Sequence, residues 1–320
     1  MSASIGVIGA GLVGSGWTIV FARAGHTVRA YDSNGDIRAS LRDRVAANLE
    51  SLQEYGLVDD AQSILARVEV VDSLGEAVDE VSYVQESVLE RTDVKRELYE
   101  TIDGIVGAEV PVGSSSSGIP ASAFTEGLRR AANYLVAHPV NPPYLHPLVE
   151  LVPSPLTDPA TVDRVHGLME DVGQIPIRVN GEVEGFILNR LQGAMLREAW
   201  ALFEEGYANA ADIDRTVKHG LGLRWSFMGP FETIDLNAPG GVRDYAQRLG
   251  GLYLSIARDR TDPKPWSDEL ISRVESERRG TLDLDDLPVR CSWRDRRLMA
   301  LAAHKASAES GESDGSGSSR

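Results

Sequence analysis

Residues 4–14 read SIGVIGAGLVG, and this stretch decides the fold of the first half of the chain. An apolar run closed by glycines is typical of a buried parallel strand that turns directly into a helix. Residues 12–25 predict that helix, which ends at Gly25. HTVRAYD at 26–32 predicts a second strand. The chain therefore opens with a strand–helix–strand unit.

A G-x-G-x-x-G motif lies inside this stretch. It is formed by Gly9, Ala10, Gly11, Leu12, Val13 and Gly14. The first glycine permits a tight turn, the second lets a pyrophosphate approach the backbone, and the third lets helix and strand pack closely. The N-terminus of the helix favours phosphate charge. Asp32 follows 18 residues after Gly14 and ends the second strand, where it can bind ribose hydroxyls.

The residues after Asp32 indicate which dinucleotide is bound. An arginine directly after this acid would favour the 2′-phosphate of NADP. Ser33 and Asn34 stand there instead, so the sequence predicts NAD. Arg38 lies further along the chain and keeps NADP as the alternative.

Strands and helices continue to alternate up to about residue 184. Further strands are predicted at 68–72, 82–87, 109–117, 133–139, 148–152 and 176–180, and helices at 37–67, with a turn near Tyr55, and at 91–106. This alternation predicts an α/β fold, a Rossmann-type doubly wound parallel sheet, over residues 1–184. Residues 185–305 show helical periodicity without strand-like alternation, and predict an all-helical C-terminal domain. Residues 306–320 are polar and low in complexity, and predict a disordered tail.

Composition excludes several classes of function. The formal net charge of −16 argues against binding to nucleic acid or to an anionic membrane surface. Residues 5–22 hold no charged residue, but their glycine motif favours a strand and a helix start over a membrane span. Cys291 is the only cysteine, so no intramolecular disulfide can form, which fits a cytoplasmic protein. We predict no metal site.

A proline-rich stretch, HPVNPPYLHPLVE, occupies residues 138–150. Proline fixes its own φ and restricts the preceding residue, so the stretch cannot be helical. We expect a stiff, extended loop that holds His138 and Asn141. It leads into a strand that carries Glu150 back toward the histidine.

These motifs together resemble the 3-hydroxyacyl-CoA dehydrogenase family. The resemblance rests on the glycine motif, the serines at 114–117, the H-x-x-N-P at 138–142 with a glutamate twelve residues after the histidine, and the G-F-x-x-N-R at 185–190. Within the family, the proline-rich stretch and GLGLRWSFMGPFET at 220–233 look more like the branch of L-gulonate 3-dehydrogenase and lambda-crystallin.

The resemblance implies a role for each matching residue. His138 matches the catalytic base, Glu150 its partner, Ser117 and Asn189 the donors to the reacting oxygen, and Asn141 a substrate contact. A neutral imidazole can take the hydroxyl proton near neutral pH, and a carboxylate can fix its tautomer and stabilise the imidazolium. Ser117 is preferred to Ser116 because it lies 21 residues before His138, as the resemblance expects.

The substrate stays open between three kinds of 3-hydroxy compound. A small free acid such as L-gulonate needs a carboxylate clamp, for which Arg224 is the candidate, with Trp225 as a wall. A CoA ester needs cations on the helical pair at 37–67, where arginines but no lysine occur. Carnitine needs an aromatic site for its quaternary ammonium, which Trp225 or Phe227 could provide.

Two further expectations concern assembly and class. The apolar faces of the helical domain, and the habit of the family, predict a homodimer. The alternative to an enzyme is a purely structural or binding protein that retains the fold, as lambda-crystallin illustrates. The intact set of Ser117, His138, Glu150 and Asn189 argues against it, because a structural protein would not require them.

Overall fold

The computed structural model describes residues 3–315. The chain divides into two compact units, which are described separately. The sheet unit comprises Met1–Gln192 and Cys291–Arg320, and the helical unit comprises Gly193–Arg290.

One eight-stranded sheet, in the order β3-β2-β1-β4-β5-β6-β7-β8, forms the centre of the sheet unit within the described residues. The strands are β1 (Ser4–Ile8), β2 (Thr27–Tyr31), β3 (Val68–Val70), β4 (Tyr83–Glu86), β5 (Val112–Ser114), β6 (Tyr134–Pro139), β7 (Leu148–Pro153) and β8 (Ile175–Arg178). All neighbours are parallel except β6 and β7, which are antiparallel. The predicted Rossmann-type sheet is confirmed, with this one reversed pair as a departure from it.

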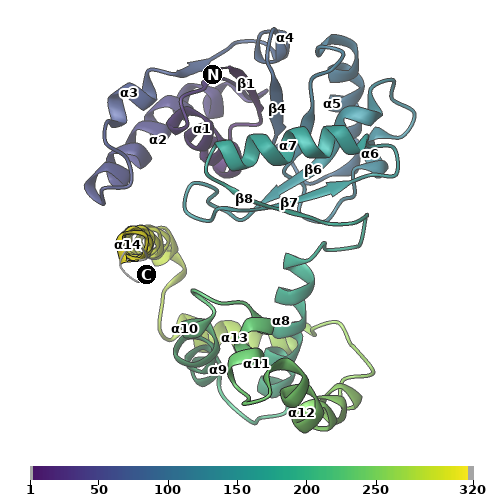
Figure 1. The fold of residues 1–320 in the computed structure, drawn as a ribbon, viewed down its shortest axis with the longest axis vertical. Coiled ribbons are helices and arrows are strands. Elements are labelled where there is room, and N and C mark those ends of the chain that lie inside the picture. The colour runs from purple at the N-terminus through teal and green to yellow at the C-terminus, as the bar shows by residue number, and fades with distance from the viewer. Residues whose placement is uncertain (1–2, 316–320) are drawn as a thin grey trace. The chain divides into compact units, whose positions relative to one another are not determined.

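Helices cover both faces of the sheet (Figure 1). They are α1 (Leu12–Arg23), α2 (Gly35–Glu54), α3 (Ala61–Leu65), α4 (Leu74–Val78), α5 (Thr92–Ile105), α6 (Ser122–Thr125), the 3-10 turn η1 (Ala131–Asn133) and α7 (Pro159–Asp171). Successive strand residues fall into two separate apolar clusters, Ala137 and Leu151 in one and Val136 and Val152 in the other. This alternation is what burial on both faces of a sheet produces.

Two helices run across the limits predicted for the domains. Helix α8 (Leu188–Glu204) begins in the sheet unit, which extends to Gln192 rather than to residue 184. Helix α14 (Leu287–Gly315) lies mostly in the sheet unit, because Met299 is buried in the same apolar cluster as Tyr144.

The tail predicted from residue 306 also differs. Alanine and glutamate propagate a helix readily, and α14 continues through Gly315. Residues 316–320 of the predicted tail lie outside the described residues.

The helical unit contains no strand within residues 193–290, as predicted. Beyond α8 it holds α9 (Ala210–Thr216), the π-helical turn η2 (Val217–Leu221), α10 (Gly222–Arg224), α11 (Pro230–Leu236), α12 (Gly241–Arg258), α13 (Asp268–Arg279) and the 3-10 turn η3 (Leu284–Asp286). Within residues 3–315, no helix combines the length and the apolar character of a membrane span.

Candidate active site

The three motif glycines serve different purposes. Gly9 has φ +87°, and a Cβ there would lie 2.5 Å from the carbonyl oxygen of Ser87. A Cβ on Gly14 would lie 1.7 Å from the carbonyl oxygen of Gly9. A Cβ on Gly11 would meet nothing within 4 Å. The fold itself therefore requires Gly9 and Gly14, whereas Gly11 keeps open the space through which a pyrophosphate approaches.

The N-terminus of α1 is suited to an anion. Gly11 gives it no side-chain cap, and its first turn holds no acidic residue. Leu12 is exposed and Val13 is half-buried. The free N–H groups of this turn can therefore bind phosphate oxygens.

Asp32 ties the glycine turn to the end of β2. Its Oδ2 accepts a hydrogen bond from the backbone N–H of Ala10 at 2.7 Å, and its Oδ1 accepts one from Asn34 at 2.9 Å. The carboxylate predicted to bind the ribose is thus held beside the turn predicted to bind the pyrophosphate.

The arginines considered for a phosphate-bearing group are all occupied. Arg38 donates to the carbonyl of Asp32 at 2.7 Å, Arg42 to Val68 at 2.7 Å, Arg44 to Ala10 at 2.8 Å and Arg67 to Ala22 at 3.3 Å. Arg38 also lies 3.6 Å from Asp72. These contacts give each of the four guanidinium groups a structural role and use part of its five N–H donors.

His138 and Glu150 lie directly opposite each other in the register of β6 and β7. The Nδ1 atom of His138 lies 2.8 Å from Oε2 of Glu150. His138 is 5% exposed and Glu150 is 0% exposed. His138 therefore sits inside a strand and not on the stiff loop that the prolines predicted. The loop at 140–147 connects the two strands and buries Tyr144 in the apolar core.

Glu150 is held in its ionised form by three donors. Burial alone would raise its pKa, but hydrogen bonds from His138, Leu188 and Ile187 lower the pKa below its ordinary value. The backbone N–H groups of Ile187 and Leu188 donate to Glu150 Oε1 at 2.8 and 3.0 Å, respectively. An ionised carboxylate only accepts, so Nδ1 of His138 carries the proton. The Nε2 lone pair, which has no partner among the described residues, is then available as a base.

Phe186 was not predicted as part of the site. It is fully buried, and its ring lies 5.7 Å from that of His138, at 59°. Its φ of +51° falls in the left-handed region, which few residues other than glycine adopt. The only sequence signal was its place after Gly185, just before α8.

The four serines at 114–117, which begin at the last residue of β5, differ in what their hydroxyls do. Ser114 donates to Glu86 at 2.6 Å, Ser115 accepts from Trp17 at 3.1 Å, and Ser116 donates to Glu90 at 2.8 Å. Ser117 is exposed, and its hydroxyl has no hydrogen-bond partner within residues 3–315. Its carbonyl accepts from Nδ2 of Asn189 at 2.7 Å. The structure thus brings Ser117 and Asn189 together and leaves the Ser117 hydroxyl free for a ligand.

Glu86, Glu90 and Lys95 support this serine segment and were also missed. Lys95 Nζ lies 2.9 Å from Glu86, and both side chains are buried. Glu90 Oε1 accepts from the N–H groups of Ser117 and Gly118 at 2.9 and 3.0 Å. Although burial would raise the pKa of Glu90, these bonds and the one from Ser116 lower it. The sequence signal for this cluster was the presence of two acids and a lysine at and just after the end of a buried strand.

The remaining predicted residues are not bound to protein partners. Asn141 is exposed in the loop after β6, and its side chain has no hydrogen-bond partner in the described part of the chain. Arg224 and Trp225 lie in the helical unit, at the end of α10. Their Nε and Nε1 atoms are buried and lack an acceptor. Buried donors of this kind call for an acceptor, such as a ligand group or a water molecule.

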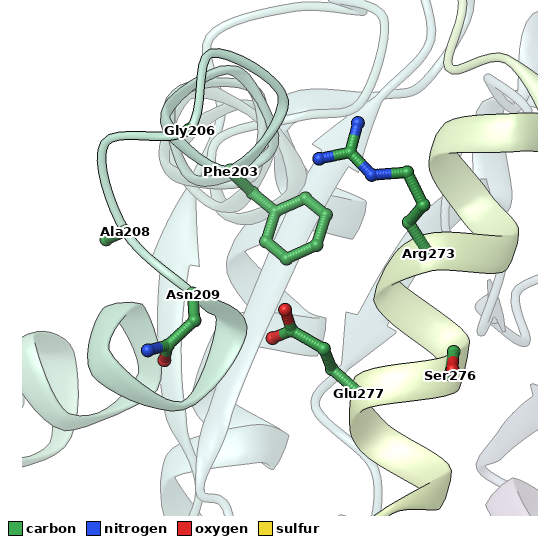
Figure 2. Close-up of a pocket in the computed structure, with 7 residues that line it drawn as sticks. All are labelled: Phe203, Gly206, Ala208, Asn209, Arg273, Ser276 and Glu277. Atoms are coloured by element: carbon green, nitrogen blue, oxygen red, sulfur yellow. The ribbon is translucent and has the colours of Figure 1, made fainter.

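A hollow of about 380 Å³ lies elsewhere in the helical unit (Figure 2). The Arg273 guanidinium lies 5.1 Å from the centre of the Phe203 ring, and Glu277 accepts from the N–H of Ala210 at 2.8 Å. None of the predicted site residues lines it, and we assign it no role in the reaction.

Comparison with known proteins identifies the family of the chain. Residues 4–183 match the family model of the 3-hydroxyacyl-CoA dehydrogenase NAD-binding domain, and residues 185–280 match that of its C-terminal domain. Lambda-crystallin of Oryctolagus cuniculus is 39% identical over 304 residues, which are 93% of this chain and 95% of that protein. L-carnitine dehydrogenase of Burkholderia mallei is 37% identical over 83% of each chain.

A solved structure extends the similarity to the whole fold. The NAD⁺-dependent 5-formyl-3-hydroxy-2-methylpyridine 4-carboxylic acid 5-dehydrogenase superposes with a TM-score of 0.81 at 26% identity, covering 94% of this chain and 98% of that one. The chain therefore belongs to the 3-hydroxyacyl-CoA dehydrogenase family and is an NAD-dependent oxidoreductase that acts on a CH–OH group.

Proposed function

We propose that the protein oxidises the 3-hydroxyl of a small free hydroxy acid, with L-gulonate as the first candidate. The observation that carries the proposal is the buried pair of His138 and Glu150, in which Nε2 of the histidine is left free. Bound NAD supplies the hydride acceptor.

The side chains of this chain supply the proton chemistry. His138 Nε2 takes the proton of the substrate hydroxyl, and Glu150 stabilises the imidazolium that forms. The Ser117 hydroxyl and the Asn189 amide donate to the reacting oxygen, which in the reverse direction stabilises negative charge on it. Asn189 keeps one N–H for this role, because the contact with the Ser117 carbonyl uses only one.

The state of the arginines supports a free acid. The four arginines at 38–67 each donate to a backbone carbonyl, which makes them less available to the phosphates of CoA. Arg224 has an orphaned Nε–H and lies next to the orphaned N–H of Trp225. A guanidinium with free donors matches a carboxylate. The similarity to lambda-crystallin points to the same branch.

Two alternatives stay open because relatives carry those names. A 3-hydroxyacyl-CoA dehydrogenase of Gibberella moniliformis is 31% identical over 93% of this chain. The similarity to L-carnitine dehydrogenase favours a quaternary ammonium substrate, for which Trp225 or Phe227 would provide the aromatic surface.

A side-by-side assay separates these substrates. NADH formation is followed with L-gulonate, L-3-hydroxybutyrate, L-carnitine and L-3-hydroxybutyryl-CoA, and kcat/KM is compared. We expect a free acid to be preferred. A preference for the CoA ester would overturn the proposed substrate class, and no turnover of any 3-hydroxy compound would favour the structural role.

Arg224→Ala tests the clamp. We expect KM for the free acid to rise about 10- to 100-fold, since a charged hydrogen bond is lost, while NADH binding is unchanged. Arg243→Ala removes an exposed arginine of α12 and serves as the matched control. An unchanged KM in Arg224→Ala would exclude Arg224 from substrate binding.

We also propose a homodimer formed through the helical unit. This unit exposes Leu223, Phe227, Phe231, Leu236, Leu252 and Leu254, each more than half accessible. Exposed apolar area of this kind commonly marks an interface. Light scattering coupled to size exclusion should give twice the chain mass of 34.7 kDa, and a single-chain mass would refute the dimer. Location in the cytoplasm stays a prediction.

A further inference from the structure

Gln85 is a fully buried amide in β4, and neither the sequence motifs nor the proposed chemistry uses it. It adjoins the apolar cluster that includes Trp17, Phe21 and Tyr83. A polar group in such a place is tolerated only if its hydrogen bonds are made.

The Gln85 amide has a partner for every donor. Its Nε2 donates to Ser115 Oγ at 2.8 Å and to the carbonyl oxygen of Ala137 at 3.3 Å. Its Oε1 accepts from the Tyr83 hydroxyl at 2.6 Å. The carbonyl of Ala137 can only accept, so the orientation of the amide is fixed by its neighbours.

Gly113 explains how one side chain reaches so far. Strands β4 and β6 are not neighbours, because β5 lies between them, and they are about 10 Å apart. On β5 the residue in register with Gln85 is Gly113. A Cβ there would lie 2.0 Å from Tyr83 Oη and 2.9 Å from Ala137 Cβ. The missing side chain at Gly113 opens the passage across β5.

The two ends of this connection lie beside proposed catalytic groups. Ala137 directly precedes His138, and Ser115 lies two residues before Ser117. Two further contacts hold the Ser115 hydroxyl in place. Its Oγ accepts from Trp17 Nε1 at 3.1 Å and lies 2.8 Å from Ser87 Oγ. Gln85 therefore contacts both the strand of the base and the segment of the hydroxyl donor.

We infer that Gln85 is a positioning residue that sets the spacing between His138 and Ser117. This inference rests on the proposed function, in which both groups act on the same oxygen. A base and a donor that share one atom must be placed to within a fraction of an ångström, and a displacement of about 1 Å can lower the rate about 100-fold. The amide provides this placement through a single rigid group.

Gln85→Leu replaces the amide with an apolar side chain of similar volume. We expect kcat to fall about 10- to 100-fold, with the Kd for NADH unchanged. The primary isotope effect from substrate deuterated at the reacting carbon should rise, because hydride transfer becomes more rate-limiting. A merely structural role would lower the thermal midpoint without changing the isotope effect.

Tyr134→Phe is the matched control. It removes a largely buried tyrosine hydrogen bond, to Asp103 at 3.0 Å, from the opposite end of β6. We expect a similar loss of thermal stability and an unchanged kcat. The inference is overturned if Gln85→Leu keeps the wild-type kcat or if kcat falls equally in Tyr134→Phe. It is also overturned if NADH binding by Gln85→Leu falls in parallel with its kcat.

Two further variants separate the possible failures. If Gln85→Leu does not fold, Ser115→Ala removes one arm alone, and a kcat equal to wild type in that variant overturns the inference. His138→Gln tests the proposed function itself. An active His138→Gln enzyme refutes that function, whereas an inactive one beside a fully active Gln85→Leu refutes only the role of Gln85.

Discussion

His138 and Glu150 are paired across β6 and β7 by strand register, and their side chains meet at 2.8 Å inside the sheet unit. The antiparallel pair makes this possible, because directly opposite residues project to the same face of a sheet. Backbone hydrogen bonds thus fix the acid and the base relative to each other.

Replacement of His138 by glutamine should lower kcat about 10²- to 10⁴-fold, the usual contribution of a general base. Binding of NADH, measured by fluorescence, should not change. His166→Gln, which alters a histidine on α7 paired with Glu170, is the matched control and should keep wild-type kcat. Equal activity in both variants would remove His138 from the mechanism.

Glu150→Gln should make stability depend less on pH. The folded-state pKa of Glu150 is lowered, so its contribution is present above the ordinary value of 4.5 and is lost as pH falls through the folded value. The difference in unfolding free energy between wild type and Glu150→Gln should therefore shrink between pH 7 and acidic pH, as urea titrations can show. A pH-independent difference would contradict the assignment. Glu50→Gln, on the exposed side of α2, provides the control.

The glycine turn allows folding and cofactor binding to be tested separately. Gly11→Ala should change the free energy of unfolding by no more than about 0.5 kcal/mol, since its Cβ meets no atom. It should nevertheless weaken NAD binding about tenfold or more, because the methyl group occupies the path of the pyrophosphate. Gly14→Ala should instead lower stability by about 3 kcal/mol through its clash with Gly9. Calorimetry with and without NAD measures unfolding and NAD binding in both variants. Equal losses of stability and of NAD binding in Gly11→Ala and Gly14→Ala would contradict the separate roles of the two glycines.

Ser116 and Ser117 should give opposite phenotypes. Ser117→Ala removes a free hydroxyl and should lower kcat about 100-fold with an unchanged thermal midpoint. Ser116→Ala breaks bonds to Glu90 and to the carbonyl of Ile119, and should lower stability by about 1 kcal/mol. If Ser116→Ala alone loses activity, the assignment of Ser117 is wrong.

The local pattern of sequence was enough for most strands of the first half, but it did not predict the reversed pair of β6 and β7 or helix α7. Apolar runs, glycine positions and the acid at Asp32 each report on a short segment, and the predicted strands and helices follow them. The limits of the units were harder to predict. Burial of Met299 in the same cluster as Tyr144 depends on packing between segments far apart in the chain, which periodicity does not report.

In the site, too, local motifs were predictable and contacts between distant segments were not. The motifs identified His138, Glu150, Ser117 and Asn189 as residues to watch, and the structure places them in one unit. The strand predicted at 133–139 contains His138, and the structure confirms it, whereas the expectation that the prolines hold His138 on a loop is wrong. Phe186 and Gln85 were missed because their importance comes from what they touch across the sheet, and an isolated phenylalanine or glutamine carries no spacing signal.

The separation between strand register and connecting loop has an evolutionary consequence. Substitutions at the exposed loop positions 141 and 147 can change the surface around Asn141 while the paired strands keep the acid and base opposed. Selection can therefore explore new substrates in this loop at little risk to proton transfer. A chain built in this way can diversify by altering recognition first, with its reaction chemistry inherited unchanged.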